Sequence, residues 1–332
     1  MTTQFKPTRR GVIAGAAAAA ALGAAPMRAF ASDYPSRPIT MIVPWGAGGG
    51  TDATGRIIAA LLERKLGQPV NVVNRTGGSG VVGHSAIATA AADGYTIGVV
   101  TVEIAMMHHQ GLTALTSNDF TPLSLMNADG PAVTVRSDAG YADIGALVEA
   151  IKASAPGTFK ASGTGQGGIW HLALVGWLQS LGLAPNHVTW VPSEGAAPAM
   201  QDLIAGGIDL VTVSLGETKA MVEAGRAVNL ALMGSERAAS RPDLTTLQEA
   251  GAGDYYTAAW RGICAPAGLP EDITAKLSTA LGEIAQDAEF TDFMNSRSFG
   301  VVYLPPADHA ALMEDTDVKM GEAMRAAGLV QG

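Results

Sequence analysis

Two glycine-rich turns contain the residues of this sequence whose types and spacing could bind an anion. The first turn reads PWGAGGGTD over residues 44–52, between a run of apolar residues and a helical pattern. The first amides of a helix have no partner within the helix, and the helix dipole places about half a positive charge there. Glycines let an anion approach those amides closely. The turn is therefore an anion site that needs no lysine or arginine, or else a tight turn with a purely structural role.

The second turn reads SGTGQGG at residues 162–168 and matches the G-x-G-x-x-G pattern of dinucleotide-binding folds. Glu194 follows at the end of the next expected strand, roughly where a ribose-binding acid could sit. This keeps an exported nicotinamide-dependent oxidoreductase that uses the Gly163–Gly168 turn as an alternative. No strong acid–base pair accompanies the turn, and the first turn lacks the lysine of a P-loop. Two similar turns favour another use, in which two helix N-termini point at one small carboxylate across a cleft.

Other residue types that could do chemistry do not favour a metal site or a catalytic centre. His108-His109 and His171 have no third metal ligand at a useful spacing, and no G-x-S-x-G nucleophile elbow is present. Cys264 is the only cysteine, which excludes an internal disulfide and a cysteine metal cluster. We therefore expect a binding protein that uses no metal, no cofactor and no catalysis.

The elements that must position the turns alternate between strand and helix. Apolar runs predict strands at 39–43, 70–74, 95–100, 132–136, 159–162, 187–191, 208–213 and 228–233. Helical patterns predict helices at 52–66, 80–92, 143–154, 169–181, 196–205 and 217–225. The last third adds isolated strands at 259–266 and 299–304 and long helices at 271–286 and 306–326. Such alternation is typical of α/β folds with mostly parallel sheets.

Two successive α/β sets predict a two-lobed fold, in which each lobe is a mostly parallel sheet flanked by helices and a ligand cleft separates the lobes. Turn-forming residues place the crossovers between the lobes near 127–131 and 235–242. Residues 32–128 then form the first part of lobe 1, residues 129–236 form lobe 2, and residues 237–332 return to lobe 1.

The first 31 residues have the pattern of a secretory signal peptide. Arg9-Arg10 precede an alanine-rich apolar run, and a small-x-small site predicts cleavage after Ala31. The arginine pair is typical of twin-arginine export, or stands by chance before an ordinary export signal. Cleavage removes four basic side chains and no acidic one, so the net charge changes from 21 − 30 = −9 to 17 − 30 = −13. This charge argues against a nucleic-acid or anionic-membrane partner.

Ordered motifs over nearly the whole chain after the signal peptide indicate a family. They are YPSRPI at 34–39, PW…GGGTD…R at 44–56, LGQPV…NR…GGSG at 66–80, ADGYT at 92–96, HL at 171–172, G…PA at 195–199, DLIAGGID at 202–209 and APAGLP at 265–270. Through these motifs the chain resembles the substrate-binding proteins of tripartite tricarboxylate transporters, the Bug-type receptors. The resemblance implies a monomeric periplasmic receptor with a periplasmic-binding-protein-like fold, which closes on a small organic acid and presents it to transporter membrane subunits.

The resemblance also implies which residues bind the ligand. In this family backbone amides of the two turns, with ordered waters, hold the proximal carboxylate. Carried over to this chain, the ligand-binding residues are Trp45, Gly46, Ala47, Gly50, Thr51 and Asp52 of the first turn and Ser162, Gly163, Thr164, Gln166, Gly167 and Gly168 of the second. Further candidates at strand ends that face the cleft are Asn74, Ser79, Thr101 and Ser214.

Two acidic residues depart from the pattern of this family. Glu194 stands where the family often has an aromatic-lysine-glycine run, and Glu103 stands where it usually has small polar residues. If either acid faces the cleft, a ligand with a hydroxyl, an amine or a single carboxylate fits better than a tricarboxylate; otherwise both are solvated loop acids. Trp45 and Trp260 stand at strand-to-turn junctions, where each either forms a pocket wall or packs in the core.

Overall fold

Apolar runs near the start of the chain form the parallel part of the first of two sheets. The computed structural model describes residues 34–330, so the signal peptide expected at residues 1–31 lies outside the described residues. β1 (Ile39–Val43) pairs in parallel with β2 (Val70–Asn74) and with β3 (Thr96–Thr101). β10 (Ala259–Pro266) pairs antiparallel with β3 and with β4 (Phe120–Asp129), which gives the order β2-β1-β3-β10-β4.

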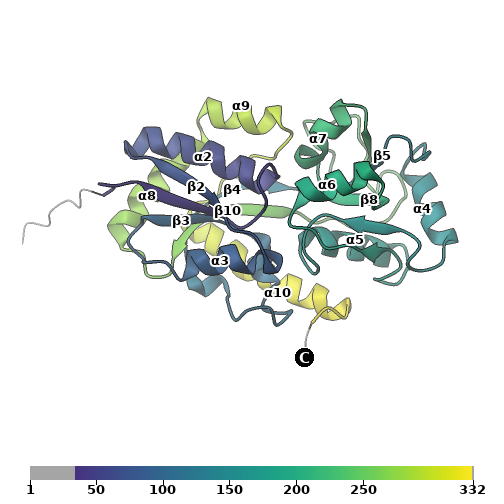
Figure 1. The fold of residues 1–332 in the computed structure, drawn as a ribbon, viewed down its shortest axis with the longest axis horizontal. Helices are drawn as coiled ribbons and strands as arrows, with labels where there is room; N and C mark the ends of the chain where they lie inside the picture. Colours follow the sequence, from purple (N-terminus) through teal and green to yellow (C-terminus); the bar gives the residue numbers. More distant parts are fainter. Residues whose placement is uncertain (1–33, 331–332) are drawn as a thin grey trace, which may run out of the picture.

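The second sheet has five strands in the order β7-β6-β8-β5-β9. Their bounds are β5 Pro131–Arg136, β6 Lys160–Ser162, β7 Thr189–Trp190, β8 Leu210–Ser214 and β9 Ala227–Leu232. β6 pairs in parallel with β7 and β8, whereas β5 pairs antiparallel with β8 and β9. Each sheet is therefore mixed, and the two sheets with their helices form two lobes side by side (Figure 1). The two-lobed α/β fold expected from the sequence is confirmed. The expectation of mostly parallel sheets was wrong, because β10 and β5 each run antiparallel to both of their neighbours.

Helices flank both sheets. Lobe 1, the lobe of the first sheet, has α2 (Gly50–Leu66), α3 (Val81–Ala88), α8 (Glu271–Ala285), α9 (Ala288–Ser296) and α10 (Pro306–Ala326). Lobe 2, the lobe of the second sheet, has α4 (Ile144–Ala153), α5 (Ile169–Ser180), α6 (Ala196–Ala205) and α7 (Leu215–Glu223). The two glycine turns lead directly into α2 and α5, as the sequence predicted.

Three elements differ from the sequence-based expectation. Sequence reasoning missed β4, where FTPLSLMNAD mixes a proline and polar residues into the apolar pattern. It also missed α9, which begins after α8 because the Asp287 side chain accepts a hydrogen bond from the Glu289 amide and caps a new helix. The prediction of a strand at residues 299–304 was wrong. Only Leu304 of that segment forms an isolated bridge, to Leu125 of β4, and Tyr303 is exposed.

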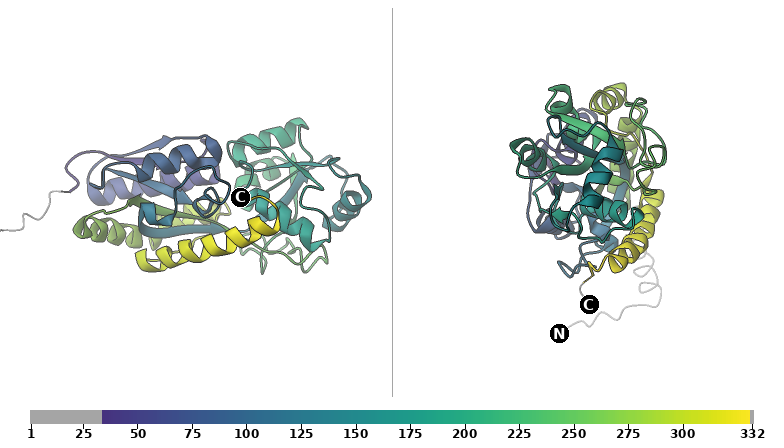
Figure 2. Two further views of the ribbon diagram at one scale, coloured as in Figure 1. Left: turned by 90° about the horizontal axis from the view of Figure 1, so that it is seen from below. Right: turned by 90° about the vertical axis from the view of Figure 1, so that its right-hand side faces the viewer.

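The chain crosses between the lobes at Gly130, which separates β4 from β5, and again between β9 and β10. α10 then runs along the outside of the molecule from lobe 1 toward lobe 2 (Figure 2). The residues that follow it, 327–329, line a groove together with Gln166 and His171 of lobe 2. The lobes are thus connected by two crossovers in the chain and by an external helix.

Buried apolar side chains fill each lobe and also join the two. Lobe 1 has a core around Met41, Leu62 and Phe290, and lobe 2 has one around Leu147 and Trp177. A further cluster contains Val102 and Ile104 of lobe 1 together with Ile169 and Trp170 of lobe 2. The lobes therefore lie closed against each other.

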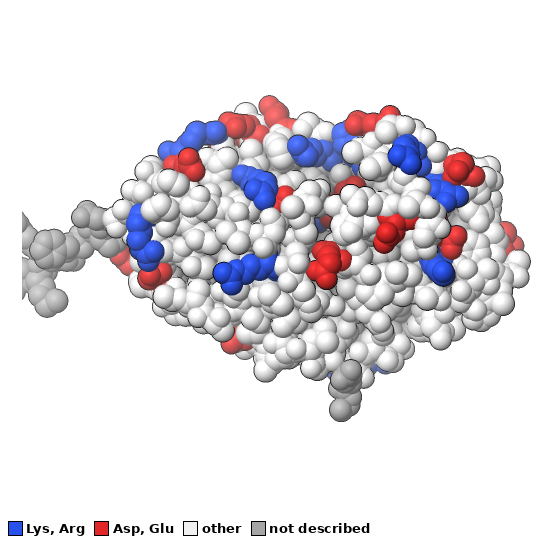
Figure 3. Space-filling model, viewed as in Figure 1, with Lys and Arg blue, Asp and Glu red and all other residues white. Residues whose placement is uncertain are grey.

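None of the helices within residues 34–330 combines the length and the apolar character that a membrane span needs. On the face drawn in Figure 3, basic and acidic side chains are interspersed rather than gathered by sign.

Candidate functional site

A small cavity lies where the two glycine turns meet between the lobes. Its walls come from both lobes and consist of Trp45, Gly46, Gly49, Gly50, Thr51, Thr101, Val102, Glu103, Thr164, Ile169, Trp170, Gly195, Ala196, Glu217, Ala259, Trp260 and Arg261. Its volume is about 20 Å³, close to what one water molecule needs. The site is therefore nearly filled by the protein's own side chains.

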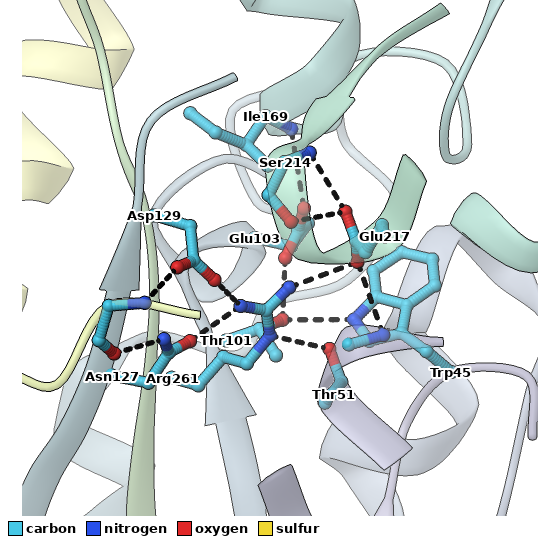
Figure 4. Close-up of polar contacts among 12 residues, drawn as sticks. Trp45, Thr51, Thr101, Glu103, Asn127, Asp129, Ile169, Ser214, Glu217 and Arg261 are labelled. Atoms are coloured by element: carbon cyan, nitrogen blue, oxygen red, sulfur yellow. Dashed lines mark hydrogen bonds and ion pairs between the residues drawn. The ribbon is translucent and has the colours of Figure 1, made fainter. Parts of the chain in front are cut away.

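Arg261 of β10 is the cation at the centre of the site. Its side chain is 4% exposed, and its Nη1 lies 2.6 Å from Oδ2 of Asp129, at the end of β4. Its Nε donates to Oγ1 of Thr51 at 3.0 Å, and its Nη2 lies 3.1 Å from Oε1 of Glu217. Asn127 accepts a further hydrogen bond from Nη1. One buried guanidinium therefore joins β4 and the first turn of lobe 1 to α7 of lobe 2 (Figure 4).

Glu217 brings a carboxylate from lobe 2 to the first turn of lobe 1. Its Oε2 accepts hydrogen bonds from the amide and hydroxyl of Ser214, a capping box that starts α7. Its Oε1 accepts a hydrogen bond from the amide of Gly50, at 3.3 Å. The N-terminus of α2 therefore already holds a carboxylate of the opposite lobe.

Glu103 makes the reciprocal contact. It belongs to a 3₁₀ turn, Val102–Ala105, directly after β3, and is 3% exposed. One carboxylate oxygen accepts from the hydroxyl of Thr101, and the other accepts from the amide of Ile169 at 3.2 Å. Ile169 is the first residue of α5, so the helix of lobe 2 holds a carboxylate of lobe 1 (Figure 4). We call these two reciprocal contacts the carboxylate exchange.

Burial dominates the electrostatics of both glutamates. Removal from water raises the pKa of the Glu103 carboxyl, and the hydrogen bond from Thr101 opposes this rise. Burial likewise raises the pKa of the Glu217 carboxyl, and the positive charge of Arg261 opposes it. A buried carboxylate is unfavourable without donors or a cation, which explains why each glutamate is directed at a helix N-terminus.

A buried histidine fixes the wall beside Glu103. His84 Nδ1 lies 2.8 Å from the carbonyl oxygen of Gly80, and its Nε2 accepts a hydrogen bond from the Thr101 amide at 3.1 Å. These partners require a neutral imidazole with its proton on Nδ1. The hydroxyl of Thr101 in turn accepts from Nε1 of Trp45, at 3.1 Å. The chain of contacts places Trp45 and Glu103 on either side of one threonine.

The buried histidines are expected to make the folded protein less stable as the pH falls. Burial lowers the pKa of His84, His171 and His309 to about 4, so these rings stay neutral in the fold. An unfolded chain takes up the protons below about pH 6.5, so stability present above that pH is lost toward pH 4. Each histidine contributes a slope of about 1.4 kcal/mol per pH unit. Urea unfolding at pH 7, 6 and 5 measures the slope.

His309 provides the variant for this measurement, because neither of its ring nitrogens has a hydrogen-bond partner in the buried site it occupies. His309→Leu is expected to reduce the slope by about 1.4 kcal/mol per pH unit while it keeps the stability at pH 7. An unchanged slope in this variant would show that His309 takes up its proton in the folded protein.

The structure brings together only part of the residue set that the resemblance implies. Those that line the cavity are Trp45, Gly46, Gly50, Thr51, Thr101 and Thr164. Other residues of the set lie behind the cavity walls. Asn74 donates hydrogen bonds to Oδ1 of Asp52 and to the carbonyl oxygen of Trp45, and Ser162 donates one to the carbonyl oxygen of Val191. Ser214 caps α7, and the surrounding turns contain Gly163, Gly167, Gly168 and Ser79. Ala47 and Gln166 are exposed and are not part of the cavity wall.

Sequence reasoning missed the charged centre of the site. Arg261 carried a signal, because a lone arginine within an apolar strand is unusual unless it is paired. Glu217 carried one too, since Ser214 and Glu217 have the spacing of a capping box. Of the two acids that depart from the family pattern, Glu103 faces the cavity and Glu194 is exposed. Both Trp45 and Trp260 form part of the cavity wall.

The histidine pair has a third potential metal ligand that the sequence spacing did not indicate. Asp317 of α10 places its Oδ1 3.0 Å from Nε2 of both His108 and His109. The ligand atoms of the three residues lie within 4.8 Å of one another. In the structure these contacts attach the segment after Glu103 to α10.

Comparisons with known proteins agree with the two-lobed fold. The family model described as tripartite tricarboxylate transporter family receptor matches residues 54–329. Protein BugT of Bordetella pertussis is 30% identical over 308 residues, which cover 91% of this chain and 90% of that protein. A further relative, from Pseudomonas sp. strain P51, is 30% identical over 279 residues, 83% of this chain and 81% of its own.

Solved structures extend this likeness to three dimensions. Rpa4515 of R. palustris, solved with adipate, has a TM-score of 0.84 at 27% identity and covers 90% of this chain and 99% of its own. MatC of Rhodopseudomonas palustris, solved with malate, has a TM-score of 0.78 at 25% identity and covers 87% of this chain and 99% of its own. A ligand-free TctC solute-binding protein from Polaromonas has a TM-score of 0.65 at 31% identity and covers 88% of this chain and 99% of its own. With a family model matched over most of its length, this chain belongs to the tripartite tricarboxylate transporter receptor family.

Proposed function

We propose that this chain is an extracytoplasmic receptor that captures a small organic carboxylate between its lobes and delivers it to transporter membrane subunits. The observation that carries the proposal is the carboxylate exchange. The first amides of α2 and α5, the helices that follow the two glycine turns, each donate a hydrogen bond to a carboxylate of the opposite lobe. Backbone amides and helix dipoles at these ends thus bind the chemical group that a ligand would bring.

Lobe closure supports the same function. The chain superposes better on the adipate-bound and malate-bound relatives, with TM-scores of 0.84 and 0.78, than on the ligand-free relative, with 0.65. The ligand-free relative is nevertheless the most similar of the three in sequence, at 31% identity. A different angle between the lobes would produce such a difference. A ligand favours the closed state only through contacts that it makes with both lobes there.

The sequence supplies the remaining parts of the proposal. The signal peptide pattern of residues 1–31 supports export, by the twin-arginine route if the arginine pair is functional. Membership of the family supports a membrane partner, and we propose a monomer as the working form. The oxidoreductase alternative has less support, because Glu194, which would bind the ribose, is exposed while Glu103 already occupies the start of α5.

A thermal-shift screen tests the proposal. Purified protein is heated with organic acids of three to six carbons, and separately with NAD⁺ and NADP⁺. A ligand at 100 times its Kd stabilises by about 2.7 kcal/mol, which raises the melting temperature of a chain of this size by about 5 °C. We expect that shift from at least one acid and none from the dinucleotides. Stabilisation by a dinucleotide alone would overturn the receptor function in favour of the oxidoreductase.

A further inference from the structure

The cavity has more negatively charged than positively charged side chains around it. Its wall contains two carboxylates, those of Glu103 and Glu217, and one guanidinium, that of Arg261. The guanidinium is shared with Asp129 at 2.6 Å, so its charge is already matched by a carboxylate outside the wall. With all four groups ionised the site carries −3 + 1 = −2 charges. A ligand that brings two further carboxylates would raise this excess inside a buried space.

Some backbone donors of the two helix ends are still available to a ligand. The first bonds within the helices are Ala53 N to Gly49 O and Leu172 N to Gly168 O. Three amides therefore precede the first bonded amide in each helix. The carboxylate exchange uses the first of these amides in each helix. The second amide belongs to Thr51 in α2 and to Trp170 in α5, and both residues line the cavity. These second amides can bind one ligand carboxylate beside the protein's own when the lobes open enough to admit it.

An unpartnered hydroxyl marks the place where a ligand is expected. Thr164 is 5% exposed, its Oγ1 has no hydrogen-bond partner, and the residue lines the cavity. A side-chain carbon on Gly168 would come within 2.7 Å of this hydroxyl and within 3.5 Å of Oε1 of Glu103. The hydroxyl of Thr164 and the carboxylate of Glu103 therefore both lie beside Gly168. A buried polar atom without a partner is unfavourable, so a ligand group there would be stabilised.

We propose that the ligand of this receptor is an amine-bearing monocarboxylate, with its ammonium group held by Glu103 and Glu217 and its single carboxylate on the remaining helix amides. Glu103 and Glu217 are then specificity-determining residues that select against dicarboxylates. This inference rests on the proposed function, because it assigns the ligand class of the same cavity. The ammonium offsets the charge of the ligand's own carboxylate, so the excess stays at −2 + 1 − 1 = −2 rather than growing to −2 − 2 = −4 with a dicarboxylate. It also supplies three donors to the two glutamates, and the lone carboxylate adds one acceptor where amides remain.

Calorimetry on matched ligands tests the inference. For each chain length from three to six carbons, four probes are compared: the dicarboxylate, the ω-amino carboxylate, the monocarboxylate and the amine. At four carbons these are succinate, 4-aminobutyrate, butyrate and butylamine. At the best chain length we expect the amino carboxylate to bind at least about tenfold more tightly than the dicarboxylate. The reason is that the interaction of one pair of charges in a buried site changes the dissociation constant by about that factor.

Charge-neutral variants assign this selectivity to residues. Glu103→Gln and Glu217→Gln keep an acceptor oxygen for Ile169 and Gly50 but remove the charge, so each is expected to lower the preference about tenfold. Glu149→Gln, on α4 with a side chain 79% exposed, is the matched control and is expected to leave the preference unchanged. Circular dichroism of each variant confirms that it is folded.

The outcomes separate the inference from the proposed function. A dicarboxylate that binds as tightly as the amino carboxylate overturns the inference and leaves a carboxylate receptor. A preference that persists in both glutamine variants overturns the role of the two glutamates. An amine that binds as tightly as the amino carboxylate overturns the binding of a ligand carboxylate by the helix amides. Failure of every probe to bind overturns both proposals.

Discussion

Replacement of Arg261 by methionine is expected to lower the free energy of unfolding by about 3–5 kcal/mol, because removal of one partner of a buried ion pair leaves uncompensated buried charge. Asp129 and Glu217, with side chains 4% and 5% exposed, both lose their cation in this variant, while methionine keeps much of the volume. Urea unfolding of the variant and the parent protein at pH 7 measures the change.

Arg64→Met is the matched control for this experiment. Arg64 pairs with Glu289 on the surface, where the two side chains are 55% and 56% exposed. Surface ion pairs contribute about 0–1 kcal/mol, so the control should change stability by no more than that. If Arg261→Met behaved like Arg64→Met, the buried network would have no role in stability. Addition of Asp129→Asn to the Arg261 variant should recover part of the loss.

Gly165→Val is expected to abolish ligand binding, by more than a hundredfold, while both lobes stay folded. A side-chain carbon at Gly165 in lobe 2 would lie 2.1 Å from Oγ and 2.9 Å from Cα of Ser79 in lobe 1. Because this clash exists only when the lobes are closed, the variant should favour an open form. Calorimetry measures binding, and small-angle scattering should show a larger radius of gyration than that of the parent.

Position 165 gives a cleaner test than its neighbour at 167. Gly167 has a φ of 74°, so any side chain there strains the turn itself, and its collision is with the flexible end of Gln110. Gly207→Val serves as the control, since a side-chain carbon there meets its nearest atom at an ordinary 3.5 Å. Full ligand affinity in Gly165→Val would contradict binding by lobe closure.

Local pattern was sufficient for most of the fold and for the backbone of the candidate site. β1, β2 and β10 have the predicted bounds, and α2 and α5 begin at the glycine turns, because apolar periodicity and turn residues act within a few positions of the chain. Gly50, Thr51 and Thr164, which the glycine turns and the family resemblance together indicated, line the cavity. Their part in ligand binding remains a prediction.

The charged centre could not be predicted from spacing, because its partners are distant in sequence. Arg261 contacts Asp129 across 132 positions and Glu217 across 44. Only the pairing of β10 with β4 and the closure of the lobes bring these residues together. The exchange of carboxylates between the lobes has the same origin, since Glu103 meets Ile169 across 66 positions and Glu217 meets Gly50 across 167.

The position of β10 has a consequence for the order in which the chain folds. β10 lies between β3 and β4 in the first sheet, although the whole second lobe separates it from them in sequence. During synthesis β4 has no neighbour in its sheet until residues 259–266 emerge, whereas the strands of the second sheet lie in one uninterrupted run from residue 131 to residue 232. The later lobe can therefore complete its sheet first, the reverse of the usual N-to-C order. A chain that stops before residue 259 contains one complete sheet and one divided sheet.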